Sequence, residues 1–120
     1  MAETLKASLP ALLARLPGSA TAIWPEGEPF VEALRHGSML VEIFAPRGTD
    51  RQSPHAQDEL YIVAEGRARF EHEGKITEAA AGDVLFVAAG EDHRFHDMSD
   101  DFVTWVIFWG PKGGEGAPVS

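Results

Sequence analysis

The sequence contains no cysteine, which excludes disulfide bridges, zinc–thiolate sites and thiol nucleophiles. It also contains no apolar run near the roughly 18 residues that a membrane-spanning helix requires. The first residues do not show a basic region followed by a continuous apolar segment, so we expect no signal peptide. These absences together predict a cytoplasmic protein.

Positive charge is scarce as well. The sequence has ten Lys and Arg residues and nineteen Asp and Glu residues, which gives a net charge of −9. A field of that sign repels phosphate backbones and anionic lipid headgroups, and it favours cationic partners, metal ions included. We therefore expect neither nucleic acid nor a membrane as a partner, and a small molecule instead.

The length of 120 residues predicts one domain, large enough to bury a core without a covalent staple. Near the N-terminus, five leucines recur at helical spacing: Leu5, Leu9, Leu12, Leu13 and Leu16. They predict a short amphipathic helix that packs outside the main core and ends at Pro17-Gly18. A frayed arm is the alternative for this segment. We assign residues 1–29 to this helix and arm.

From residue 30 onward, short apolar segments alternate with glycine-containing breaks. We expect strands at Phe30 to Leu34, Ser38 to Ala45, His55 to Ala64, Arg67 to His72, Lys75 to Ala79, Asp83 to Ala88, His93 to Asp97 and Phe102 to Trp109. Short strands at near-regular spacing, with no helical pattern between them, are typical of an all-β sandwich or barrel. Residues 30–110 therefore form the predicted barrel, and residues 111–120 have too little apolar content to fold and are predicted to be a disordered tail.

The third predicted strand combines polar and apolar character. Side chains alternate along a strand, so His55, Gln57 and Glu59 would share one face, with Leu60 and Ile62 on the other. Such a strand is central and buried on both faces, and buried polar groups need partners. Two interpretations remain open at this point: a hydrogen-bonded polar cluster at the barrel mouth, or a metal site with imidazole and carboxylate ligands.

A second segment has a spacing that resembles a known family, the cupins. Gly82 is followed after five residues by Ala88, then by Gly90, by His93 and by Asp97. The second cupin motif reads Gly, five residues, Pro, any residue, Gly, two residues, His, three residues, Asn. The spacing agrees throughout, with alanine in place of the proline and aspartate in place of the asparagine.

The first cupin motif is matched in its second half. That motif reads Gly, five residues, His, any residue, His, three or four residues, Glu, six residues, Gly. Glu59 and Gly66 have the required separation, and His55 falls in the second histidine position. Ser53 occupies the first histidine position, and Gly48 is one residue closer to that position than the motif asks.

The resemblance implies a double-stranded β-helix, or jelly-roll, barrel with a divalent transition metal (Fe, Mn, Ni or Zn). By the resemblance, His55, Glu59 and His93 take three of the four usual ligand positions. Ser53 is a weak ligand for such a metal, so the fourth position is left to the carbonyl oxygen of Gln57 or to water. The alternative is a metal-free barrel in which these groups form a hydrogen-bond network.

Strand geometry adds a constraint on this ligand set. Residues His55 and Glu59 would lie about 13 Å apart on a fully extended strand. Ligand atoms must approach a transition metal to about 2.1 Å, so both side chains reach one ion only if the backbone bends. We therefore predict an irregular backbone from Ala56 to Asp58. A regular strand would instead favour His55, Gln57 and His93 as the ligands.

Aromatic residues in the predicted strands are candidates for a small-molecule pocket, because such pockets are mostly apolar with a few placed polar groups. The candidates are Tyr61, Phe86, Phe95 and Trp105. Core packing is the other role open to each of them.

The function expected from these residues is that of a small metal-binding cupin acting on an unidentified small molecule, as a metal-dependent dioxygenase or isomerase. Glu59 would then serve both as ligand and as base. A non-catalytic small-molecule binding or sensing cupin is one alternative, and a metal-free barrel with a structural polar cluster is another. Because exposure of the leucine-rich segment, Trp24 and Phe30 to solvent is unfavourable, we also expect a homodimer.

Overall fold

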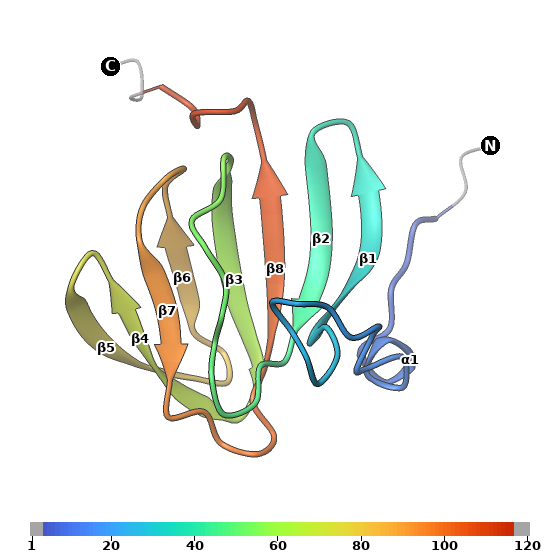
Figure 1. Ribbon diagram of the computed structural model, residues 1–120. Coiled ribbons are helices and arrows are strands. Elements are labelled where there is room, and N and C mark those ends of the chain that lie inside the picture. The colour runs from blue at the N-terminus through green and yellow to red at the C-terminus, as the bar shows by residue number, and fades with distance from the viewer. Residues whose placement is uncertain (1–3, 117–120) are drawn as a thin grey trace.

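The protein is described by a computed structural model that covers residues 4–116 and consists of one short helix and eight antiparallel strands (Figure 1). The elements are α1 (Leu9–Leu13), β1 (Phe30–His36), β2 (Met39–Phe44), β3 (Asp58–Glu65), β4 (Arg67–His72), β5 (Lys75–Ala80), β6 (Val84–Val87), β7 (His93–His96) and β8 (Val103–Trp109). Every predicted strand is present, and most begin or end within two residues of the expected position.

The strands form two sheets. One has five strands in the order β1-β2-β8-β3-β6, and the other has three strands in the order β5-β4-β7. The chain crosses between the sheets after β3 and again after β5, β6 and β7, as a jelly roll requires. The predicted all-β jelly-roll fold is therefore confirmed, including the central position of β3 between β8 and β6.

Alternation along the strands places the core between the two sheets. In β3, the side chains of Glu59, Tyr61 and Val63 are buried, whereas Leu60 and Ile62 lie half-buried on the opposite face. The apolar core between the sheets consists of Phe44, Tyr61, Val63, Ala68, Phe70, Ala79, Val87, Phe95, Phe102, Val106 and Phe108. Glu59 is thus a charged residue on the core-facing side of a central strand.

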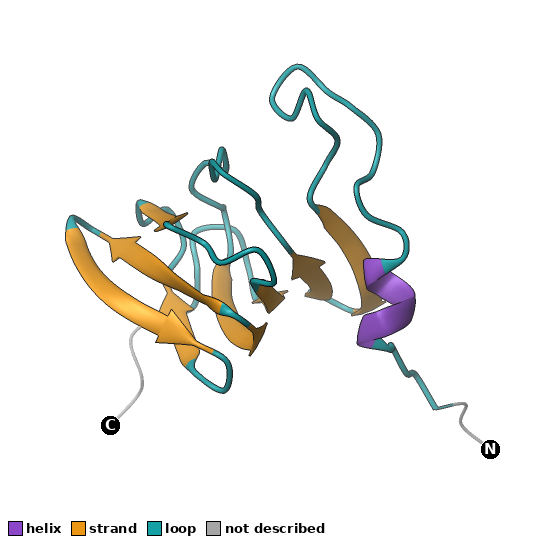
Figure 2. Cartoon of the chain, turned by 90° about the horizontal axis from the view of Figure 1, so that it is seen from below, coloured by secondary structure: helices purple, strands orange, loops and turns teal. Residues whose placement is uncertain are grey.

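The helix lies outside this core, as predicted, beside the β1–β2 end of the molecule (Figure 2). Leu12 is buried against Ile43, Ala45 and Val103, on the outer face of the five-stranded sheet. The helix is only five residues long, and Pro10 lies in its first turn, where its missing N–H costs no helical hydrogen bond. Among residues 4–116, no helix is long and apolar enough to cross a membrane.

Gly66 closes the β3–β4 turn in a conformation that only glycine fits. Its φ is +74°, and a Cβ there would lie 2.5 Å from Ser99 Oγ and 2.7 Å from the Cα of Phe102. Both the positive φ and the close approach of other backbone exclude a side chain. This is the glycine that ends the first cupin motif.

The segment after β8 is partly tied to the barrel. The Gly113 N–H donates to the Ala56 carbonyl at 2.7 Å, and the Glu115 N–H donates to Asp58 Oδ2 at 2.9 Å. These bonds lie within the range predicted as a disordered tail, whose last residues, 117–120, are outside the described residues.

Candidate metal centre

The backbone bends immediately before β3. The strand begins at Asp58 rather than at His55, and Ala56 and Gln57 form a bend. The expected strand start at His55 is therefore wrong. The irregular backbone predicted from Ala56 to Asp58 is confirmed at Ala56 and Gln57, whereas Asp58 already belongs to the strand. Because His55 is on a loop, strand alternation does not fix its direction, and it approaches Glu59 despite the separation of four residues.

Three potential ligands meet between the two sheets. One ligand atom from each of His55, Glu59 and His93 lies within 4.8 Å of the other two. Glu59 comes from β3 in the five-stranded sheet, His93 from the start of β7 in the three-stranded sheet, and His55 from the preceding loop. Glu59 is 1% exposed and His93 is 2% exposed, so two of the three groups are removed from water.

The buried atoms of this cluster lack partners. Nε2 of His93 lies 2.7 Å from Oε1 of Glu59, but the contact does not have hydrogen-bond geometry. Among the described residues, neither carboxylate oxygen of Glu59 nor Nε2 of His93 has a hydrogen-bond partner. His93 can neutralise Glu59 only in its protonated form, and buried polar atoms without hydrogen bonds are destabilising, so a cation between these atoms would supply the missing contacts. The donor set of two imidazoles and one carboxylate fits a divalent transition metal.

His93 is oriented for ligation by its other ring nitrogen. Nδ1 lies 2.9 Å from the backbone carbonyl oxygen of Glu91, and since a carbonyl only accepts, Nδ1 donates. In the neutral imidazole, the Nε2 lone pair then faces Glu59, which is the form that binds metals. Burial lowers the pKa of His93, but the Glu59 carboxylate and the Glu91 carbonyl outweigh it, so the pKa is raised overall. A proton would therefore compete with any metal ion for Nε2.

The turn that leads into His93 is held by two carboxylates. Glu91 accepts from the Ala88 N–H at 2.7 Å and contacts Nε2 of His72 at 2.9 Å. Asp58 accepts from the Ala89 N–H at 2.9 Å, which joins the turn to the start of β3. A proline at position 88 has no N–H to donate to Glu91, so the alanine found in place of the motif's proline has a structural use here.

Asp97, the other departure from the second motif, follows β7 with a φ of +51°. Asparagine and aspartate are the residues other than glycine that adopt this left-handed conformation most readily. Aspartate therefore suits the backbone conformation found at this position.

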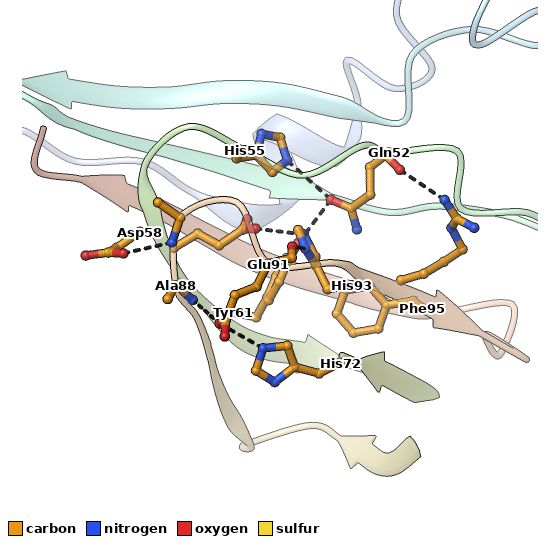
Figure 3. Close-up of polar contacts among 12 residues, drawn as sticks. Gln52, His55, Asp58, Tyr61, His72, Ala88, Glu91, His93 and Phe95 are labelled. Carbon is orange, nitrogen blue, oxygen red and sulfur yellow. Dashed lines mark hydrogen bonds and ion pairs between the residues drawn. The ribbon is translucent and has the colours of Figure 1, made fainter. Parts of the chain in front are cut away.

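A second group of polar residues, not found by the sequence analysis, surrounds the cluster. Asp50 is 2% exposed and accepts from the Phe95 N–H at 2.9 Å, from the Gln52 N–H at 3.0 Å and from Gln52 Nε2 at 2.7 Å. Because a carboxylate only accepts, these bonds fix the Gln52 amide with its nitrogen toward Asp50. Its Oε1 accepts from the Tyr61 hydroxyl at 3.1 Å and makes a long contact of 3.4 Å with His55 Nε2 (Figure 3).

These surroundings shift two further pKa values. Burial raises the pKa of Tyr61 well above its usual range, and the nearby Glu59 and Asp50 carboxylates add to the effect, so the hydroxyl stays protonated. Burial also lowers the pKa of His55, although the Glu59 carboxylate opposes this. His55 is therefore neutral near pH 7 and able to offer a lone pair.

The two candidates for the fourth ligand have different surroundings. Ser53 is exposed and lines a hollow of about 370 Å³ that adjoins the cluster. Gln57 lines the same hollow, but its amide nitrogen donates to the Ser38 carbonyl at 3.2 Å and to the Gly110 carbonyl at 2.8 Å. The amide oxygen that contacts His55 belongs to Gln52 instead.

The hollow that adjoins the cluster is also lined by His55, Gln52 and Tyr61 together with apolar residues. Of the four aromatic residues predicted to form a pocket, Tyr61 lines this hollow. Phe95 is 1% exposed and packs against Tyr61 in the core with a ring-centroid distance of 5.0 Å. Phe86 and Trp105 lie elsewhere: Phe86 is 52% exposed on β6, and Trp105 packs against the outer cluster around Leu12.

Comparison with known proteins agrees with this fold. Residues 40–109, more than half of the chain, match the family described as the cupin domain. An uncharacterised protein from Streptomyces coelicolor is 40% identical over 85 residues, which cover 69% of this chain and 81% of that protein. The chain therefore belongs to the cupin domain family.

Solved structures show the same fold at low sequence identity. A protein from Thermus thermophilus is 18% identical, with a TM-score of 0.67 over 93% of this chain and 100% of that chain. KdgF from a Halomonas species is 15% identical, with a TM-score of 0.61 over 69% of this chain and 78% of that chain.

Proposed function

We propose that this cupin binds one divalent transition metal through His55, Glu59 and His93 and acts on a small molecule held in the adjoining hollow. The observation that carries the proposal is the set of three buried atoms without hydrogen-bond partners, namely both carboxylate oxygens of Glu59 and Nε2 of His93. Iron, manganese, nickel and zinc all accept this donor set. A metal bound there would supply Lewis-acid chemistry or the activation of dioxygen for the oxygenase or isomerase reaction.

The residues of the chain have separate roles in this proposal. Glu59 would hold the metal in this proposal. Both of its carboxylate oxygens are buried and it does not line the hollow, so a role as base requires a bound molecule to reach beyond the residues that line the hollow. Tyr61 keeps its proton and presents a neutral hydroxyl oriented by Gln52. The Asp50 carboxylate fixes Gln52 and through it both Tyr61 and His55.

Metal-dependent stabilisation tests the proposal. Chelator-treated protein should unfold at a higher temperature after addition of Mn²⁺, Ni²⁺ or Zn²⁺, because a ligand that binds only the folded state stabilises it by mass action. Glu59→Gln and His93→Ala should lose most of this shift. An equal shift in the wild type and in both variants would contradict the assigned ligands.

The reaction is tested with loaded protein. Oxygen consumption in the presence of candidate substrates indicates a dioxygenase, and exchange of substrate protons with solvent deuterium indicates an isomerase. Saturable binding with neither reaction would replace the enzymatic proposal by the binding or sensing alternative. If no metal binds at all, the result would favour the remaining alternative, a metal-free barrel in which the polar cluster has a structural role.

A further inference from the structure

Aromatic rings from three separate segments form one wall of the hollow beside the metal cluster. Trp24 belongs to the arm after α1, Phe30 begins β1 and Phe44 ends β2, and all three line the hollow. The ring centroid of Trp24 lies 6.4 Å from that of Phe30 and 6.3 Å from that of Phe44, with interplanar angles of 75° and 77°. The indole therefore meets both phenyl rings nearly at right angles, and the three rings form a corner.

A carboxyl group faces the same hollow. Leu40, Glu42 and Phe44 alternate on β2 and all line it, so Glu42 points inward between two apolar side chains. Its partner across the sheet in β8 is Val106, which also lines the hollow. Within residues 4–116, no group makes a hydrogen bond or an ion pair with the half-buried Glu42 side chain.

The charged groups around Glu42 do not neutralise the negative charge of its carboxylate. Burial raises the pKa of Glu42 to about 7, and the carboxylates of Glu32, Glu59 and Glu28 act in the same direction. Arg35 opposes this shift but is itself paired with Glu32 at 2.8 Å. An ionised Glu42 therefore lacks a cation that the protein itself provides.

Arg51 is the arginine that lines the hollow, and it is exposed at the mouth. Water solvates an exposed guanidinium and screens its attraction for a ligand anion. An anion entering further would meet Glu42, with Glu59 and Glu28 nearby. In the metal-free protein, the interior of the hollow therefore disfavours anions, in agreement with the net charge of −9.

We propose that this hollow binds a small organic cation, an ammonium or quaternary ammonium compound, with its charged head against Trp24 and Phe44 and its charge balanced by Glu42. The inference rests on the proposed function in that it takes the hollow beside the metal cluster as the substrate site. Aromatic faces attract cations through the quadrupole of the ring, most strongly for tryptophan. A cation also supplies the partner that Glu42 lacks. The volume of about 370 Å³ suits a small molecule.

Three isosteric probes test the role of charge in chelator-treated protein: choline, the neutral 3,3-dimethylbutan-1-ol and the anion 3,3-dimethylbutanoate. Isothermal titration should show choline binding at least about ten-fold more tightly than the alcohol, and the anion should not bind. The alcohol and the anion can form neither an ion pair with the Glu42 carboxylate nor a cation–π contact with the aromatic rings. Glu42→Gln, which keeps the side-chain shape, should weaken choline binding about ten-fold. Trp24→Leu should do the same.

Matched controls are available on other parts of the barrel. Glu78→Gln changes an exposed carboxylate on β5, and Trp109→Leu changes a tryptophan that packs on Phe86, so neither should alter choline binding. Circular dichroism checks that Trp24→Leu is folded. If Trp24→Leu does not fold, the choline affinity of Glu42→Gln alone tests the inference. Equal affinity for choline and the alcohol, tighter binding of the anion, or unchanged choline affinity in Glu42→Gln would each overturn the inference.

Metal content measured on the same samples before chelation separates this inference from the metal proposal. Normal metal content with no choline binding overturns the cation inference alone. Choline binding to a protein that never takes up metal supports the cation site and overturns the metal centre.

Discussion

Nε2 of His93 lies 2.7 Å from Oε1 of Glu59, and the two side chains come from facing sheets of the barrel. Another histidine–carboxylate pair has almost the same separation: Nε2 of His96 lies 2.8 Å from Oε1 of Glu71. The second pair is about 35–40% exposed and hydrogen-bonded, whereas the first is buried and its facing atoms have no hydrogen-bond partner. The difference in surroundings, rather than the residue types, is the reason that we propose a metal ion at the first pair.

The pKa of Glu42 predicts how stability depends on pH in metal-free protein. Its folded value of about 7 lies above the ordinary 4.5, so the folded state binds the extra proton between these values. The stability that Glu42 contributes is full below pH 4.5 and is lost as the pH rises through 7. Glu42→Gln should therefore be more stable than the wild type by about 1–2 kcal/mol at pH 8, with solvent screening allowed for, and nearly equal to it at pH 4.5.

Urea unfolding at the two pH values checks this expectation. A difference between Glu42→Gln and the wild type that is the same at both pH values would mean that Glu42 titrates normally.

Asp50 should be important for stability although it touches no predicted ligand. Asp50→Ala leaves the N–H of the buried Phe95 and the amide of Gln52 without their acceptor. Loss of a buried charged acceptor should cost about 2–4 kcal/mol in the free energy of unfolding. Asp83→Ala removes an exposed carboxylate that accepts from the Ala80 N–H at 2.8 Å, and it should cost less than about 1 kcal/mol. Equal losses in denaturant unfolding would contradict the role given to Asp50.

Gly66 and Gly74 provide a matched pair of glycines with positive φ. Gly66→Ala should destabilise by about 3 kcal/mol or more, because a Cβ there meets Ser99 Oγ and the Phe102 backbone in addition to the strained φ. Gly74 has a φ of +80° but nothing within 4 Å of a Cβ, so Gly74→Ala should cost only about 1 kcal/mol. Thermal unfolding of both variants measures the difference. Similar losses of stability in the two variants would show that the positive φ, and not the close contacts of a Cβ, determines the cost.

We predict a homodimer that uses the outer face of the five-stranded sheet. Val84 and Phe86 on β6 are 59% and 52% exposed, and Phe86 packs on Trp109 with a ring-centroid distance of 6.1 Å. Exposed apolar clusters of this kind mark interfaces. Light scattering at micromolar concentration should give a dimer mass for the wild type and a monomer mass for Phe86→Asp. Ile76→Asp, at an equally exposed position on β5, should remain dimeric, and a monomeric wild type would refute the prediction.

Much of the barrel follows from local sequence signals. β4 was predicted with the bounds Arg67 to His72 that the structure has, because alternation and flanking glycines define both of its ends. The start of β3 was not predicted, since the alternation of His55, Gln57 and Glu59 continues through the bend at Ala56 and Gln57. The need for two ligands to reach one ion, rather than any local pattern, indicated the irregular backbone.

Strand pairing explains why other site residues were misplaced or missed. Trp105 pairs with Ile62 and Phe86 with Leu60, so both aromatic side chains lie on the outer face, which is known only once the register is known. Gln52 accepts a hydrogen bond from Tyr61, and Asp50 accepts one from the Phe95 N–H, so both act through partners that are distant in sequence. A local signal did exist, because the Gln52 N–H bonds to the Asp50 side chain two residues earlier, the arrangement of an Asx turn.

Elemental analysis of the protein purified without an affinity tag tests the metal centre most directly. The wild type should contain about one equivalent of Fe, Mn, Ni or Zn per chain, and His55→Ala and His93→Ala should each retain less than about a tenth of it. His96→Ala, at the exposed pair, should keep the wild-type content. Retained metal in Glu59→Gln alone would show that the Glu59 carboxylate is not required as the third ligand, and full occupancy in both His55→Ala and His93→Ala would contradict the metal centre.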